Sequence, residues 1–325
     1  MKPTLVTGAS GFIGWHIASL LLEAGHTVRA LVRKGSKVPG LDVQIFEGDL
    51  RDARSVQQAI LGCGAVFHVA ADYRLWARNR DEIFETNVRG TAQLLELASI
   101  ENVDRFVYTS TVGCIGIPSD GWGEESTPVR VEEMTGAYKQ SKYLAEESVM
   151  RLASQGFPAI IVNPTAPVGE RDAKPTPTGR MILDFLRGNM PAYIDTGLNV
   201  VDVADVARGH LLAYEHGVPG ERYILGAENL TMREILEIVA EESGLKAPGL
   251  KLPYALAMGF AVLDTGFSAI SGREPRAPLD AVKMARKKMF VTCQKAERDL
   301  GYNPGPARQG LAKAVRWYRE NGYCA

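Results

Sequence analysis

The first half of the chain alternates short apolar runs with longer stretches in which apolar residues recur at helical spacing. The apolar runs, which predict buried strands, span residues 3–6, 27–32, 43–47, 65–71, 105–109 and 158–163. Helices are predicted between them over 15–23, around 56–60, over 83–98 and over 137–152. This alternation predicts an α/β fold with a doubly wound parallel sheet.

The pattern changes beyond Pro164, where several prolines interrupt the chain. Short strands are predicted at 199–202 and 222–225, and helices near 180–186 and over 204–216, 231–243, 280–289 and 307–321. Thr231 and Glu234 form a predicted capping box at the start of one of these helices. We therefore expect a first domain over 1–170, to which the segment at about 196–226 returns. Residues 171–195 and 227–325 would form a smaller, mostly helical domain that covers the carboxyl edge of the sheet.

One mostly apolar segment, residues 252–270, is only just long enough to span a bilayer. It contains Gly259 and Asp264, so we predict an amphipathic or buried helix and no stable membrane insertion. The large apolar residues at helical spacing along it, which we assign to the core, are Leu256, Phe260, Leu263 and Phe267. The alternative is that they form a face apposed to a membrane or to a hydrophobic substrate.

Composition narrows the function classes. The 325 residues carry a net charge of −1, which gives no indication of a nucleic-acid partner. The four cysteines are scattered along the sequence and are predicted to be reduced thiols. The five histidines do not have the spacing of metal ligands, so no metal site is predicted. Because the N-terminus leads directly into a strand with no signal peptide, we expect a cytoplasmic protein.

The first strand leads into a glycine-rich turn with the spacing Gly-x-x-Gly-x-x-Gly. Gly8 permits a tight turn, Gly11 lets a pyrophosphate approach the backbone, and Gly14 lets the helix pack close to the strand. The free N–H groups at the helix N-terminus favour phosphate binding. This context predicts an NAD(P)-binding, Rossmann-type domain, the alternative being a turn without a ligand. The expected cofactor-binding residues of the turn are Gly8, Ser10, Gly11, Phe12, Ile13 and Gly14.

Cofactor choice is expected at the end of the second strand, where an acidic residue selects NAD and a basic residue accommodates the extra phosphate of NADP. Arg33 stands there and no Asp or Glu does, so NADP is favoured over NAD. The alternative is a solvated loop arginine. After the fourth strand, the small residues Ala70 and Ala71 would let a flat cofactor lie against the backbone.

Tyr138 and Lys142 stand four residues apart and share one face of a predicted helix. A free tyrosine is a poor base at neutral pH, and a nearby ammonium is expected to lower its pKa. A hydroxyl at the end of the adjacent strand, Thr111 or Ser110, could hold the substrate oxygen. These groups can exchange a proton with an alcohol or carbonyl while a nicotinamide exchanges a hydride.

Together these motifs resemble those of the extended short-chain dehydrogenase/reductase family over nearly the full length of the chain. The matching pieces lie at 7–14, 48–50, 68–71, 87–91, 108–111 and 138–142. The resemblance implies that Thr111 and Tyr138 are catalytic, and that Lys142 holds the nicotinamide ribose and tunes Tyr138. It also implies a homodimer formed through the helices that carry Asn87 and Tyr138. The further cofactor contacts it implies are Asp49 and Leu50 at the adenine, Asn87, and Asn163 and Pro164 at the nicotinamide.

Two branches of this family share further features with the chain. The second strand and Arg33 resemble dihydroflavonol reductases, whereas segments 71–78, 163–169 and 174–179 resemble bacterial hopanoid-associated sugar epimerases. Dehydration is disfavoured, because the family's dehydratases carry Asp-Glu after the catalytic threonine and this chain has Val112 and Gly113.

Several residues are candidates for substrate binding. Arginines after the fourth strand could clamp an anionic substrate, or they could simply be solvated. The substrate candidates are Tyr73, Arg74, Trp76, Arg78 and Arg273. We expect an NAD(P)-dependent enzyme that either reduces a ketone or aldehyde with an exchanging cofactor or epimerises a sugar with a retained one. A cofactor-binding regulatory or scaffold protein without turnover is the alternative.

Overall fold

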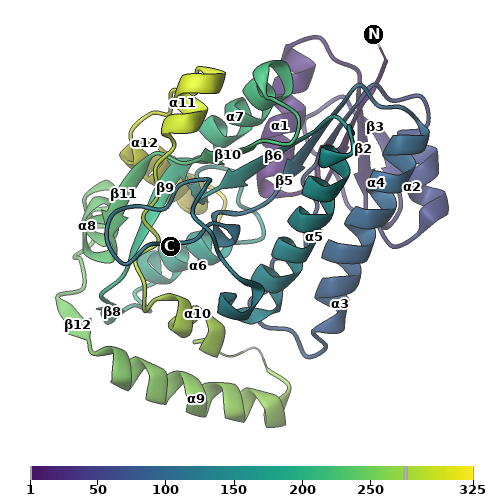
Figure 1. Ribbon diagram of the computed structural model, residues 1–325. Helices are drawn as coiled ribbons and strands as arrows, with labels where there is room; N and C mark the ends of the chain where they lie inside the picture. The colour runs from purple at the N-terminus through teal and green to yellow at the C-terminus, as the bar shows by residue number, and fades with distance from the viewer. Residues whose placement is uncertain (1, 274, 276, 325) are drawn as a thin grey trace.

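The computed structural model describes residues 2–273, 275 and 277–324, and at its centre lies a seven-stranded parallel sheet (Figure 1). The strand order is β10-β6-β5-β4-β1-β2-β3. The strands are β1 Thr4–Thr7, β2 Val28–Val32, β3 Gln44–Glu47, β4 Ala65–His68, β5 Arg105–Thr109, β6 Ala159–Pro164 and β10 Arg222–Leu225. All six pairings are parallel, which confirms the predicted doubly wound sheet.

Helices cover both faces of this sheet, because side chains alternate across each strand. In β1, Leu5 packs with the helices on one face and Val6 with those on the other. The first face carries α2 (Ala53–Ile60), α4 (Gly90–Ile100) and α5 (Gly136–Ser154). The second carries α1 (Phe12–Glu23), α7 (Val203–His216) and α11 (Gln294–Leu300).

Two predicted helices differ from those observed. α1 begins at Phe12 rather than Trp15, because Gly11 already caps the helix in an extended conformation. The helix predicted over 83–98 is three pieces: α3 (Asp81–Phe84), a π-helical turn (Glu85–Arg89) and α4. Asn87 lies in the π-helical turn, where its amide bonds to the loop after β4. The extra residue in such a turn is a common feature of functional sites.

The rest of the chain forms a second layer of helices and short sheets. Its strands are β7 Ala166–Val168, β8 Ala192–Ile194, β9 Gly197–Asp202, β11 Glu228–Thr231 and β12 Leu250–Leu252. A shared apolar core joins β7 and β9 to α6 (Pro177–Leu186), α8 (Met232–Ser243) and α12 (Ala307–Glu320). The capping box predicted at Thr231 and Glu234 is present. The exact domain boundaries stay a prediction.

The apolar segment forms α9 (Tyr254–Ser271), which lies apart from the central sheet at the bottom of Figure 1. Here the prediction of a core strip is wrong. Leu256, Phe260, Leu263 and Phe267 are 63%, 55%, 75% and 62% exposed, because the helix packs through its small residues instead. Its neighbour α10 (Leu279–Met284) is shorter than the helix predicted over 280–289. Among the described residues, none of the helices has the length and apolarity that a bilayer span requires.

Candidate active site

The glycine-rich turn joins β1 to α1 at the carboxyl edge of the sheet. Gly8 has φ +76°, and a Cβ there would lie 2.8 Å from the backbone nitrogen of Ala70. A Cβ on Gly14 would penetrate the carbonyl group of Gly8, so only glycine lets α1 pack this closely. The two positions therefore need glycine for reasons that the sequence analysis gave, a tight turn and close helix packing.

The N-terminus of α1 opens toward solvent. No side chain caps it, and the first backbone bond of the helix runs from the Trp15 N–H to the Gly11 carbonyl. The N–H groups of Phe12 and Ile13 therefore have no helical carbonyl to bond. Gly11 and Ser10 are exposed beside them. These free donors, the positive end of the helix dipole and the missing Cβ groups fit a pyrophosphate.

The residues predicted at the adenosine end of the cofactor lie after β2 and β3. Arg33 is exposed and makes no ion pair with the described residues. The Asp49 carboxylate accepts from Arg51 Nε at 2.8 Å and Nη2 at 2.7 Å, and this pairing lowers its pKa. Leu50 is buried, and its Cβ would lie 2.9 Å from a Cβ built on Gly90. Asp49 thus already has a strong side-chain partner.

A buried hydrogen-bond chain that the sequence analysis missed ties the turn to the helices behind it. Thr7 Oγ1 accepts from the N–H groups of Val69 and Ala70, both at 3.2 Å, so its own hydrogen points to His68 Nδ1 at 2.8 Å. His68 Nε2 then donates to Thr91 Oγ1 at 2.9 Å. Burial lowers the pKa of His68 to about 3, which keeps the imidazole neutral. Thr7 and His68 both lie within the sequence motifs that match the family, so these motifs could have pointed to the two residues.

The same chain continues to the helix that carries the predicted catalytic pair. Thr91 Oγ1 donates to the Asn87 carbonyl at 2.6 Å, and Asn87 Nδ2 donates to Ser141 Oγ at 2.9 Å and to the Asp72 carbonyl at 2.9 Å. Asn87 was predicted as a cofactor contact. In this structure its amide is fully engaged in holding the loop after β4 against α5.

Tyr138 and Thr111 lie together at the carboxyl edge of the sheet. The Tyr138 side chain is partly exposed, but the dense surroundings of its hydroxyl raise its pKa, and a hydrogen bond with Thr111 acts in the opposite direction. Thr111 Oγ1 accepts from the Gly113 N–H at 3.1 Å, which leaves its own hydrogen available to another acceptor. Two hydroxyl donors therefore meet at one point.

Lys142 is buried beneath them. Its Nζ donates to the Thr109 carbonyl at 2.7 Å and lies 4.2 Å from the centre of the Tyr108 ring. Burial lowers the pKa of Lys142 to about 8. The expectation that Lys142 lowers the pKa of Tyr138 is wrong for this structure, because the ammonium turns toward Thr109 and burial dominates at the phenol.

Behind these residues lies a buried polar group on β6. Asn163 Nδ2 donates to the Thr111 carbonyl at 3.0 Å and to Glu146 Oε2 at 2.9 Å, while its Oδ1 has no partner in the structure. Glu146 also pairs with Arg222 at 3.1 Å. Pro164 ends β6, beside Leu225 of β10. Asn163 thereby fixes the backbone of Thr111, and Glu146 is a second residue that the sequence analysis missed.

The predicted substrate residues are only partly brought together. Arg74 is held by Asp72 at 2.6 Å and Glu82 at 3.0 Å, so its charge is already neutralised. Tyr73 donates to the Lys174 carbonyl at 3.2 Å and ties the loop to the second layer. Arg78 and Arg273 are exposed on different segments, and neither makes an ion pair with the described residues. The predicted arginines therefore form no convergent clamp within the part of the chain that the structure describes.

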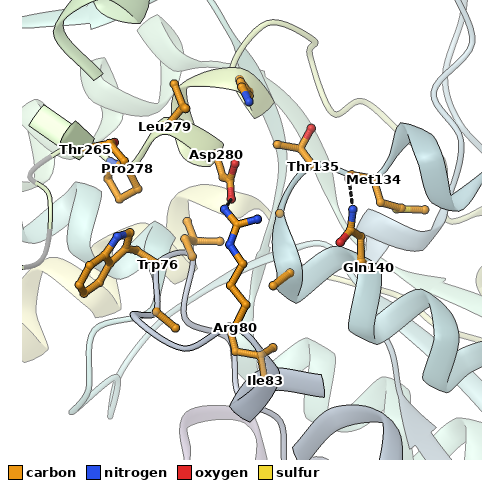
Figure 2. A pocket seen from close by; sticks show the side chains of 15 residues that line it. Trp76, Arg80, Ile83, Met134, Thr135, Gln140, Thr265, Pro278, Leu279 and Asp280 are labelled. Carbon is orange, nitrogen blue, oxygen red and sulfur yellow. Dashed lines mark hydrogen bonds and ion pairs between the residues drawn. The ribbon is translucent and has the colours of Figure 1, made fainter. Parts of the chain in front are cut away.

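A cavity of about 380 Å³ lies beside the start of α5, between the loop after β4 and the α9–α10 pair (Figure 2). Figure 2 shows Arg80 crossing it to Asp280, at 3.8 Å, with Trp76 to one side. The lining combines apolar residues, Leu75, Trp76, Ile83, Met134, Ala137 and Leu279, with polar and charged ones, Arg80, Thr135, Gln140, Thr265, Asp280 and Lys283. Ala137 and Gln140 flank Tyr138 in the chain, so the cavity adjoins the predicted catalytic residues without including them.

Metal ligation has no structural support, since the described residues contain no group of three or more His, Cys, Asp or Glu arranged to hold an ion.

The sequence model of the NAD dependent epimerase/dehydratase family matches residues 4–226, more than half of the chain. The chain belongs to this family. The match covers the glycine-rich turn, Thr111, Tyr138 and Lys142, and it ends just after β10. The prediction of an enzyme of the NAD-dependent oxidoreductase and epimerase type is therefore confirmed at the level of the family.

Individual relatives match the chain from end to end. A Synechocystis protein provisionally named dihydroflavonol 4-reductase is 44% identical, with 98% of this chain and 95% of that protein covered. Sterol demethylase protein B of Methylococcus capsulatus is 36% identical, with 98% and 99% covered. The crystal structure of gox2253 superimposes with a TM-score of 0.89 at 44% identity, and the whole of each chain is covered. The Rossmann-type fold and the family resemblance are thus confirmed.

Proposed function

We propose that the protein is an NADP(H)-dependent reductase of a ketone or aldehyde, with Tyr138 as the proton donor. The observation that carries this proposal is the meeting of the Tyr138 and Thr111 hydroxyls above buried Lys142, on the same sheet edge as the glycine-rich turn. The residues proposed to hold the cofactor are the turn residues 8 and 10–14, Arg33, Asp49, Leu50, Ala70, Ala71, Asn87, Tyr138, Lys142, Asn163 and Pro164.

The bound nicotinamide would supply a hydride to the carbonyl carbon. Two side chains of the protein act on the carbonyl oxygen. The Thr111 hydroxyl, which is oriented by the hydrogen bond that it accepts from the Gly113 N–H, donates a hydrogen bond to this oxygen, and Tyr138 donates the proton. A raised pKa keeps Tyr138 protonated at neutral pH, which suits an acid in the reductive direction. Lys142 is the residue proposed to hold the nicotinamide ribose beside this pair, from its buried position under Thr109.

The cavity beside α5 offers apolar side chains such as Trp76, Met134 and Leu279 to a bulky substrate, together with polar groups that could bond its oxygen atoms. Its arginine, Arg80, is paired with Asp280, and the other cation of its lining is Lys283. Diphosphate groups are typically held by several convergent arginines or by backbone donors. This lining has a single arginine, which is paired, and its backbone donors are those at the uncapped start of α5. The names of two relatives, a dihydroflavonol reductase and a sterol demethylase protein, agree with a bulky apolar substrate.

Epimerisation of a sugar, with hydride returned to the opposite face, is the competing function, and the family's description supports it. The preference for NADP rests on exposed Arg33 at the end of β2. A link to hopanoid lipid metabolism rests on the sequence resemblance, and a cytoplasmic location rests on the four free cysteines. A homodimer through α4 and α5 is also part of the proposal.

The deciding experiment is to denature the purified protein and identify any nucleotide it releases. We expect no stoichiometric nucleotide, reversible binding of NADPH on titration, and NADPH oxidation with apolar ketones or aldehydes. Stoichiometric NAD or NADP would instead indicate a retained cofactor, and sugar nucleotides would then be tested for epimerisation. Tight cofactor binding without turnover of any carbonyl, alcohol or sugar nucleotide would support a regulatory protein.

A further inference from the structure

The outward face of α9 carries a continuous row of large apolar side chains. Leu256, Phe260, Leu263, Phe267 and Ile270 recur at intervals of four and three residues, so they share one side of the helix. Each is more than half exposed, and Ile270 reaches 89%. Single exposed apolar residues are ordinary on a protein surface, but a row of five on one helix marks an interaction site.

The inward face of the same helix has the opposite character. Ala257, Ala261 and Ser268 are buried, and the two alanines form a small cluster with Val282 of α10, against which Tyr254 and Met258 also pack. The fully buried residues of α9 are therefore small, and its most exposed residues are large and apolar. If α9 served only to pack on its own domain, its large apolar residues would be expected on the buried face, because burial of large apolar side chains stabilises a fold most.

The surroundings of the apolar row are basic. Between Leu245 and Phe290 the sequence has eight lysines and arginines against three acidic residues. Arg273 follows the C-terminal residue of α9 by two positions, and Arg286 and Lys287 lie just after α10, which packs against α9. All three are exposed, and none makes an ion pair with the described residues. This segment therefore carries a net charge of +5, whereas the rest of the chain is acidic, since the whole protein has a net charge of −1.

We propose that α9 is a membrane-binding helix that lies in the headgroup region of an anionic phospholipid bilayer. An amphipathic helix binds there by burying its apolar row among acyl chains while basic residues beside it attract the charged headgroups. The helix does not cross the bilayer, because it contains Asp264 and its small-residue face stays on the protein. Figure 1 shows α9 at the edge of the molecule, and the exposed side chains of the row are therefore accessible to a flat surface.

A second copy of the chain is the other occupant to consider, and the charges disfavour it. Two α9 helices packed row against row about a twofold axis would bring the basic residues of both copies together. Like charges at such an interface oppose association, whereas an anionic surface neutralises them. The basic flank therefore favours the lipid surface.

The test is co-sedimentation of the full chain with two kinds of vesicle, phosphatidylcholine alone and phosphatidylcholine with about one-third phosphatidylglycerol. We expect binding to the anionic vesicles that weakens as salt is raised. The double variant Leu263→Glu and Phe267→Glu should lower the bound fraction about tenfold or more. Its matched control is Leu61→Glu with Ile100→Glu, which changes residues 61% and 64% exposed elsewhere and should bind like the unaltered protein.

A charge-reversal pair separates the two contributions. Arg286→Glu with Lys287→Glu should reduce binding to the anionic vesicles, while Arg151→Glu, an exposed change on α5, should not. Circular dichroism checks that every variant is folded. The proposal is overturned if the unaltered chain binds neither vesicle, or if the control pair reduces binding as much as the α9 pair. Self-association that Leu263→Glu abolishes, without vesicle binding, would identify a second copy as the occupant instead.

Discussion

Replacing Tyr138 by Phe removes one hydroxyl and tests its proposed role as proton donor. We expect turnover to fall about 10²–10⁴-fold, the usual contribution of a positioned acid or base, with NADPH affinity almost unchanged. Steady-state NADPH oxidation and fluorescence titration measure the two quantities. The matched control is Tyr143→Phe, a partly exposed tyrosine on the same helix. Equal activity of both variants would refute the assignment of Tyr138.

Gly14 tests whether close packing of α1 on the turn is required. An alanine Cβ there would penetrate the Gly8 carbonyl group, so backbone must move. We expect Gly14→Ala to lower the free energy of unfolding by about 1–3 kcal/mol, as overpacking does, and to weaken cofactor binding. Gly259→Ala, in the helix interior of α9 with open space around it, should instead stabilise by about 0.5–1 kcal/mol. Denaturant unfolding compares the two, and a similar effect of both would contradict the packing argument.

Most elements could be predicted from the sequence because their periodicity reports burial directly. The strands of the sheet and the capping box at Thr231 were found this way. The π-helical turn at Asn87 could not be, since it depends on hydrogen bonds to Asp72 and Ser141, which are distant in the chain. The face of α9 was assigned wrongly because a period of 3.6 shows that residues share a side and does not show which side faces the protein.

The candidate active site was also predicted only in part from the sequence. The sequence motifs located Tyr138, Thr111 and Lys142 on one sheet edge, because parallel strands end together there. They did not reveal the direction of the pKa shift at Tyr138, which depends on how deeply the hydroxyl is surrounded. Nor did they show that Arg74 is neutralised by Asp72 and Glu82. Such pairings are decided by side-chain placement within a loop, on which spacing carries no information.

Two buried histidines make the stability of the protein depend on pH: His68, in the hydrogen-bond chain from β1 through β4 to α4, and His210 of α7, which bonds to Thr109. His68 and His210 are neutral in the folded state, with pKa lowered by burial to about 3 and about 4. Unfolded histidines bind protons below about pH 6.5, so the unfolded state gains protons first as pH falls. The free energy of unfolding should therefore decrease from about pH 6.5 down to the folded pKa values.

Replacing His68 by Asn isolates one of these protons. The variant should lose about 1–3 kcal/mol at pH 7, because Thr7 and Thr91 lose their shared partner. Between pH 6 and pH 4 the free energy of unfolding of the variant should fall less steeply than that of the unaltered protein. The difference between the two slopes should be about 1.4 kcal/mol per pH unit. Denaturant unfolding at a series of pH values measures the slopes. His216→Asn, at an exposed position, should leave the slope unchanged, and equal slopes for all three proteins would contradict the assignment.

The proposed homodimer depends on a whole surface of the molecule and not on a single sequence motif. The proposed dimer face combines α4 and α5, which pack side by side on one face of the sheet. On the outer side of α5, Leu144 is 39% exposed and Tyr143 is partly exposed, while Phe84 and Val88 are partly exposed near the start of α4. A twofold axis through this face would bury these apolar groups against their copies and form a four-helix arrangement.

Sedimentation velocity at micromolar concentration should therefore show a dimer, and Leu144→Glu should shift it to monomer by placing a charge at the centre of the interface. Leu61→Glu, at 61% exposure in the turn after α2, is the matched control and should leave the dimer intact. The α9 pair, Leu263→Glu with Phe267→Glu, should also leave it intact, since we assign that helix to lipid. A monomeric unaltered protein would refute the dimer, and a dimer lost only with the α9 pair would move the interface to α9.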